Sequence, residues 1–220
     1  MEKKLNICPY MIDLTPNIIL SKPQLGENIG STARAMKNFG IEKLRLIEPR
    51  DGWPNSSAYA ISAGAGDVLN KINVFKSLEE ATKDISLLFA TTARKRVIGT
   101  KPLDVFEAID KSFHHVVNGG QVGFLFGPEQ SGLSNDDVVQ ADYTISIPLN
   151  QNFSSLNLSQ AVLLICWEWN KVKMSHFKED NLPIKVNKKL KKSTEISNVG
   201  DREYFYCLLY TSPSPRDLRA

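Results

Sequence analysis

Short apolar runs alternate with helix-period segments from about residue 17 to residue 175, and this alternation limits the possible folds more than any other feature. The apolar runs predict strands over 17–20, 43–47, 85–90, 122–126 and 143–147. The segments between them predict helices over 29–39, 56–63, 78–83, 105–117, 135–140 and 158–173. Short strands separated by helices are typical of βαβ units, so we predict an α/β fold with a mainly parallel sheet flanked by helices.

Two of the predicted strands indicate where a ligand should bind. The runs 85–90 and 122–126 are almost wholly apolar, as expected of strands covered by helices on both faces. In parallel sheets of this kind, ligands bind outside the carboxyl ends of the strands. We therefore expect the functional residues in the loops that follow the strands.

Composition excludes several classes of protein. With 42% hydrophobic residues the chain is not disordered, and no apolar run approaches the roughly 18 residues of a membrane helix. We expect no signal peptide, because no apolar stretch follows Lys3 and Lys4. The three cysteines form no CxxC pair and no metal spacing, and without a disulfide framework they fit a reducing, cytoplasmic setting. The net charge of +3 permits a nucleic-acid partner without identifying one.

The C-terminal region differs from the rest of the chain. Residues 207–220 resemble a translated sequencing adapter, although a natural Pro/Ser-rich tail is the alternative. Lysines dominate 176–198, which we interpret as a basic linker that either follows an RNA backbone or is a solvated tether. We expect 1–14 to be a tail, 15–175 the main domain, and 199–206 the start of a truncated helix.

Two glycine-rich segments mimic nucleotide-binding loops. Gly64-Ala-Gly66 follows a helical pattern and is interpreted as a helix stop. The glycines of 127–132 have P-loop spacing after a strand, but Leu133 stands where a P-loop has lysine, so a nucleotide triphosphatase is not expected. Ser134 and Asp137 then form a potential capping box, which predicts a sharp strand–loop–helix turn.

Two further segments carry polar groups suited to a site. In 26–34, Asn28 is placed to cap a helix that also bears Arg34, which predicts either a phosphate site or a plain amphipathic helix with a solvated arginine. The loop 148–159 is dense in hydrogen-bonding side chains and long for a simple connection.

Three motifs, taken in order, resemble the SPOUT superfamily of RNA methyltransferases, most closely its TrmH/TrmJ-type branch. They are Asn28–Arg34, Phe126–Ser134 and Ile147–Leu158. The resemblance covers roughly residues 15 to 170, and 49–54 and 90–96 also match TrmJ-type proteins. It implies a sheet threaded into a deep trefoil knot, a homodimer, and methylation of a ribose 2′-hydroxyl in the tRNA anticodon loop, at cytidine or uridine.

The resemblance also implies the site. S-adenosylmethionine is expected to contact residues from three loops, namely Thr91, Thr92, Ala93, Gly127, Ile147, Ser155, Leu156 and Asn157. The catalytic residues implied are Asn28, Arg34, Glu129 and Asn157. Because guanidinium groups stay protonated, we interpret Arg34 as a cation that binds the adjacent phosphate and stabilises the developing alkoxide, rather than as a general base. Asn28 would fix that phosphate or the helix start, and Glu129 would orient Arg34 or accept a hydrogen bond from the substrate.

Three alternatives stay open. The substrate could be ribosomal RNA, the chain could be a catalytically idle RNA-binding homologue, or it could be a phosphate-binding metabolic enzyme on a doubly wound sheet. No cluster of His, Cys and carboxylates suggests a metal, and His114 and His115 are expected to complement a helix dipole. Trp167 and Trp169 are expected in the core or at a dimer contact.

Overall fold

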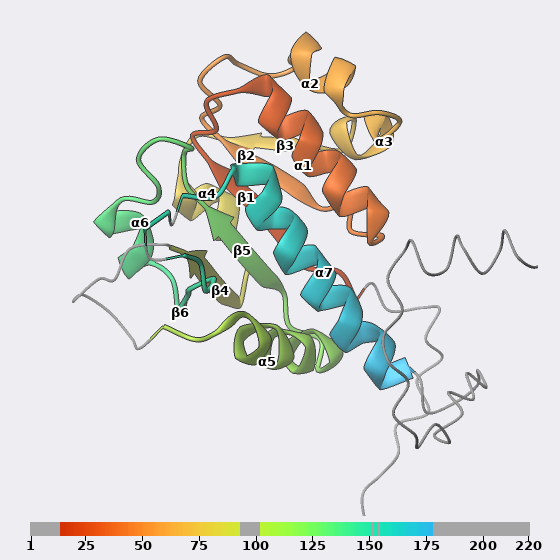
Figure 1. Cartoon of the computed structure of the whole chain (residues 1–220), viewed down its shortest axis with the longest axis vertical. Coiled ribbons are helices and arrows are strands. Elements are labelled where there is room, and N and C mark those ends of the chain that lie inside the picture. The colour runs from red at the N-terminus through yellow and green to blue at the C-terminus, as the bar shows by residue number, and fades with distance from the viewer. Residues whose placement is uncertain (1–13, 93–101, 151, 154, 178–220) are drawn as a thin grey trace, which may run out of the picture. The chain divides into compact units, whose positions relative to one another are not determined.

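The computed structural model describes residues 14–92, 102–150, 152–153 and 155–177, and these form a parallel sheet with helices on both faces (Figure 1). The strand order is β3-β2-β1-β5-β4-β6, and every neighbouring pair is parallel. The strands are β1 Asn17–Ser21, β2 Leu44–Ile47, β3 Asn73–Phe75, β4 Leu87–Thr91, β5 Val122–Phe126 and β6 Tyr143–Ile145. The helices are α1 Gly26–Asn38, α2 Ser56–Ile61, α3 Gly66–Leu69, α4 Leu78–Thr82, α5 Val105–Val117, α6 Asn135–Val139 and α7 Leu158–Phe177. The predicted fold class is confirmed.

Successive residues of the central strand β1 belong to two separate cores. Ile18 and Leu20 pack in the core under α1, α5 and α7, whereas Ile19 packs in the core under α4 and α6. Side chains of a strand alternate between faces, so a strand covered on both sides must be apolar throughout. Figure 1 shows α1 and α7 side by side on one face of the sheet.

The sequence predicted most elements and missed two short ones. Helix α5 has the predicted bounds because its start and end carry local signals: Asp104 caps the first turn and Gly119 adopts a positive φ after the last. Strand β3 was missed because it has only three residues, with Val74 47% exposed, and shows no periodicity. Gly64 does follow the end of α2 with a positive φ, as predicted, but Gly66 unexpectedly opens α3.

Helix α7 continues to Phe177, so the predicted linker 176–198 begins too early. Tertiary contact explains the extra turn, because the ring of His176 stacks on Phe113 of α5. The rest of the linker, the helix at 199–206 and the segment 207–220 lie outside the described residues, as do 1–13 of the predicted tail.

The trefoil knot stays a prediction, because it depends on the path of every connection and 93–101 lie outside the described residues. Among the described helices, none combines the length and apolar character needed to cross a membrane.

Candidate active site

A pocket of about 310 Å³ lies where the carboxyl ends of β4, β5 and β6 open into their loops. Ligands of open parallel sheets bind at this edge. The pocket is lined by Thr91, Thr92, Phe126, Gly127, Pro128, Glu129, Gln130, Ser131, Gly132, Leu133, Ile147, Leu149, Ser155, Leu156, Leu158 and Ala161. Three stretches of the chain that are far apart in sequence therefore meet in one cavity.

Six of the eight residues expected to contact the cofactor line this pocket: Thr91, Thr92, Gly127, Ile147, Ser155 and Leu156. Ala93 lies outside the described residues. Asn157 is not among the lining residues, because its side chain is engaged with the neighbouring helices. The sequence analysis missed Gln130, Ser131 and Leu149, although each lies within a loop that it singled out.

The loop after β5 is shaped by glycine. A Cβ on Gly127 would collide with the backbone of Gly132 and Leu133, so the loop can fold back on itself only with glycine at this position. Gly132 has φ +64° and donates a 2.8 Å hydrogen bond to the carbonyl of Pro128. Ser134 and Asp137 then form the predicted capping box of α6. The predicted strand–loop–helix turn is confirmed.

Glu129 connects this loop to the start of α1. Its Oε2 accepts a 2.8 Å hydrogen bond from the backbone N–H of Gln24, and its Oε1 accepts one from the backbone N–H of Leu25 at 3.3 Å. Asn28 Nδ2 donates a third, of 2.7 Å, to Oε1. The carboxylate therefore provides acceptors for donors at a helix start, where backbone N–H groups have no partner within the helix.

Asn157 joins the start of α7 to the same network. Its Nδ2 donates a 3.0 Å hydrogen bond to Asn28 Oδ1, and its own Oδ1 accepts from the backbone N–H and hydroxyl of Ser159. Glu129, Asn28 and Asn157 thus form a polar relay, in which one side chain from each motif is bonded to the next. We call this set the Glu129–Asn28–Asn157 relay.

The prediction that Asn28 caps its helix is wrong. Helix α1 starts earlier, at Gly26, and the N-cap position is Leu25, which offers no side-chain hydrogen bond. The amide of Asn28 is instead taken by Glu129 and Asn157. Gly30, in the same part of α1, lies close to α2, since a Cβ there would collide with the backbone carbonyl of Ala58.

Arg34 is exposed and apart from the relay. Six residues after Asn28, at 100° per residue, it projects about 120° away from Asn28 around the helix axis. Within the described part of the chain its guanidinium makes no hydrogen bond or ion pair, and Glu129 is engaged elsewhere. The structure therefore brings together three of the four predicted catalytic residues and leaves Arg34 facing solvent.

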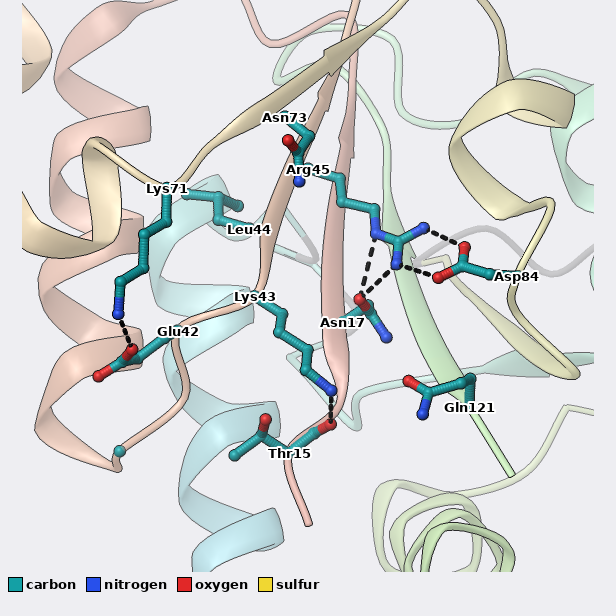
Figure 2. Close-up of a pocket in the computed structure, with 11 residues that line it drawn as sticks. Thr15, Asn17, Glu42, Lys43, Leu44, Arg45, Lys71, Asn73, Asp84 and Gln121 are labelled. Carbon is teal, nitrogen blue, oxygen red and sulfur yellow. Dashed lines mark hydrogen bonds and ion pairs between the residues drawn. The ribbon is translucent and has the colours of Figure 1, made fainter. Parts of the chain in front are cut away.

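A larger cavity of about 730 Å³ lies at the opposite edge of the sheet, near the amino ends of the strands. Arg45 is one of its lining residues (Figure 2), and its Nη2 lies 2.8 Å from Asn17 Oδ1 and 2.7 Å from Asp84 Oδ2. Lys71 likewise pairs with Glu42. Because these charges are neutralised by one another and the edge is not where such sheets bind ligands, we place the site at the smaller pocket.

Arg45 also changes the titration of its partner. The hydrogen bonds from its guanidinium hold the pKa of Asp84 below its usual value, against an opposing effect of burial. Nη1 donates a further 2.7 Å hydrogen bond to the carbonyl of Ala81, which lies in α4. This network is a structural connection between β1, β2 and α4.

The matching family model, described as the SpoU rRNA Methylase family, covers residues 15–167. The chain belongs to this family. The match contains the pocket and the whole Glu129–Asn28–Asn157 relay.

Individual relatives agree with the family match. The SpoU-family chain is 33% identical over 202 residues to the tRNA (cytidine/uridine/adenosine-2'-O-)-methyltransferase TrmJ of Pseudomonas aeruginosa, a match that covers 90% of this chain and 77% of the relative. It is 38% identical to the tRNA (cytidine/uridine-2'-O-)-methyltransferase TrmJ of Sodalis glossinidius, over 69% of this chain and 58% of that relative. The crystal structure of TrmJ from Z. mobilis ZM4 superposes with a TM-score of 0.69 and 49% identity, over 71% of this chain and 69% of that one.

Proposed function

We propose that this chain transfers a methyl group from S-adenosylmethionine to a ribose 2′-hydroxyl of tRNA, at a cytidine or uridine of the anticodon loop. The observation that carries the proposal is the convergence of all three motifs on one pocket and its relay at the carboxyl edge of the sheet. The names of the relatives from Pseudomonas and Sodalis support the reaction and the RNA. With only three cysteines the chain has no disulfide framework, which fits the cytoplasmic setting that we propose.

The pocket suits S-adenosylmethionine in size and chemistry. Its volume of about 310 Å³ is at the lower end of the range for small-molecule sites. Ile147, Leu149 and Leu156 offer apolar surface for the adenine ring, while the glycine-rich loop 127–132 offers backbone groups for the polar end. The bound cofactor would supply an electrophilic methyl group on sulfonium.

Arg34 supplies the charge that the reaction requires. A 2′-hydroxyl is a weak nucleophile at neutral pH, so a site must stabilise the alkoxide that forms as its proton leaves. The solvent-facing, positively charged guanidinium of Arg34 is available to an RNA phosphate, which supports an electrostatic role.

Glu129, Asn28 and Asn157 act as positioning residues. Glu129 holds the start of α1 and the amide of Asn28, and so is engaged there rather than with Arg34. Asn157 fixes the start of α7 beside the pocket lining residues Ser155 and Leu156. The relay thereby keeps the cofactor loop, the helix that bears Arg34 and the last helix in one arrangement.

Ribosomal RNA is the second candidate substrate, because the description of the matching family names it. The motifs bind cofactor and phosphate and do not select the RNA. Direct competition between unmodified tRNA and ribosomal RNA fragments for labelled methyl groups separates the two candidates. A catalytically idle homologue would label neither.

We also propose that the chain acts as a homodimer. Helix α7 exposes three apolar side chains along its length, Leu163, Trp167 and Met174, with 38%, 49% and 52% of their surface accessible. Trp169, in contrast, is fully buried in the core. Exposure of a row of apolar side chains to water is unfavourable, so we expect a second copy of the chain to pack against it. Light scattering of the wild type should give twice the chain mass, and Trp167→Glu should lower it towards the monomer. Lys83→Glu should not, because Lys83 is exposed at the end of α4, which covers the other face of the sheet.

The transfer itself is tested with methyl-labelled S-adenosylmethionine. Purified chain incubated with unmodified tRNA should place label in the RNA, and more than in ribosomal RNA fragments at equal concentration. Label in ribosomal RNA alone would transfer the assignment to the second candidate. A chain that binds ATP but not S-adenosylmethionine would contradict the proposal.

A further inference from the structure

Two of the chain's three histidines meet where α5 and α7 end, outside the pocket described above. His114 lies in the last turn of α5 and His176 near the end of α7. Together with Asp110 of α5, they offer one ligand atom each, and these three atoms lie within 4.8 Å of one another. The sequence analysis found no such cluster, because only Asp110 and His114, four residues apart, are local neighbours.

Both histidine rings already make contacts that fix their orientation. The ring of His176 stacks on Phe113 at 4.8 Å between centroids and 23° between planes, and Phe113 is itself buried. His114 Nδ1 donates a 2.9 Å hydrogen bond to the backbone carbonyl of Asp110, which leaves the lone pair of a neutral ring on Nε2. Metal-binding histidines characteristically make such a hydrogen bond from the other ring nitrogen.

We propose that Asp110, His114 and His176 bind one Zn²⁺ ion that ties α5 to α7. Two imidazoles and one carboxylate are a common set of zinc ligands, with the fourth position left to water. Zinc–ligand bonds of about 2.0–2.2 Å place neighbouring tetrahedral ligand atoms about 3.3 Å apart, so the side chains must close in slightly from their present positions. Both histidines are exposed and Asp110 is only half-buried, so rotation of these side chains can bring the three ligand atoms closer together.

The electrostatic surroundings suit a cation. Asp110 supplies a negative charge, and His114 Nδ1 lies 3.6 Å from its Oδ2. The adjacent cation on α5, Lys111, has its ammonium 4.9 Å from the ring centroid of Tyr143, which is a favourable contact away from the cluster. A bound ion would fasten the last turns of α7, at the point where the chain leaves the described domain.

The test is a calorimetric titration of the tag-free full chain with zinc chloride, in a Cys8→Ser/Cys207→Ser background that removes competing thiols. We expect one ion per chain and a higher thermal midpoint with zinc. His176→Ala should weaken binding by at least about tenfold, since even the loss of a residue that only hydrogen-bonds to a metal ligand costs about 10–100-fold. His115→Ala is the matched control, because His115 lies on the same helix but its Nε2 is 2.8 Å from Ser86 Oγ.

Asp110→Asn, which keeps the side-chain shape, guards against a folding defect in the histidine variant and should also weaken binding. Circular dichroism establishes that each variant is folded. Absence of zinc binding by the Cys8→Ser/Cys207→Ser chain would overturn the proposal. So would binding that His176→Ala and Asp110→Asn leave unchanged, or that His115→Ala abolishes.

Discussion

The side-chain amide of Asn157 donates a 3.0 Å hydrogen bond to Asn28, and so joins the start of α7 to the first turn of α1 across 129 residues of sequence. Asn28 in turn donates a 2.7 Å hydrogen bond from its Nδ2 to Glu129 Oε1. Three loops thus converge through side chains rather than through backbone pairing. The geometry of the pocket depends on these few bonds.

Glu129→Ala should destabilise the fold and reduce cofactor binding. The substitution leaves the backbone N–H groups of Gln24 and Leu25, and the amide of Asn28, without their acceptor. Unmaking such bonds costs about 1–3 kcal/mol in free energy of unfolding, measurable by urea denaturation. Glu27→Ala is the control, because it removes the same charge from an exposed position in the first turn of α1, to which Glu129 is hydrogen-bonded. Equal losses in both variants would argue against the relay.

Two glycine substitutions should have opposite effects. Gly30→Ala places a methyl group against the carbonyl of Ala58 and should lower the free energy of unfolding by about 1–3 kcal/mol. Gly66→Ala meets nothing within 4 Å at the start of α3 and should be neutral or stabilising by about 0.4–1 kcal/mol. Thermal denaturation of the two proteins decides the matter. A stable Gly30→Ala chain would show that α1 and α2 are not packed as described.

Arg45→Met should destabilise the sheet at its amino edge. The buried Asn17 would lose the guanidinium that donates to its Oδ1, and the carbonyl of Ala81 would lose a donor. We expect a loss of about 1–3 kcal/mol. Arg50→Met is the control, since Arg50 pairs with Asp51 at the surface, where ion pairs contribute little.

The same pair predicts a pH dependence. Because the pKa of Asp84 is lowered in the folded chain, its contribution is fully present above the usual pKa of 3.8 and is lost as the pH falls through the folded value. Wild type should therefore lose more stability on acidification than Arg45→Met does. Parallel curves of unfolding free energy against pH would contradict this.

Cys166 should be inert in the folded chain. Burial raises the pKa of its thiol to about 12, so almost no thiolate exists at pH 8. Above pH 9.0 the Cys166 thiol ionises in the unfolded chain but not in the folded one. Its ionisation therefore favours unfolding, and the free energy of unfolding falls as the pH rises towards 12. In a Cys8→Ser/Cys207→Ser variant, a maleimide should label Cys166 only after denaturant is added. Rapid labelling without denaturant would show that α7 is not seated on the core as described.

Local sequence patterns predicted most strands and helices, whereas the side-chain contacts depend on residues far away in the sequence. Strand β5 was predicted with its observed bounds because five apolar residues between polar turns describe a buried strand without reference to the remainder of the chain. Asn28 was misassigned because its first turn resembles a cap, while its actual partners lie 101 and 129 residues away. The pairing of Arg45 with Asp84 and the meeting of His114 with His176 likewise depend on how helices settle on the sheet. Spacing in a sequence contains no signal for such contacts.

The most direct test of the central claim is to identify the methylated nucleoside. The wild-type chain, Arg34→Ala and the control Lys37→Ala are each incubated with methyl-labelled S-adenosylmethionine and unmodified tRNA, and the digested RNA is analysed by mass spectrometry. Lys37 lies one turn further along α1 and pairs with Asp67, so its loss should leave activity nearly unchanged. We predict 2′-O-methylcytidine or 2′-O-methyluridine from the wild type, reduced about 10²–10³-fold in Arg34→Ala. Methylation of a base, or undiminished ribose methylation in Arg34→Ala, would contradict the account.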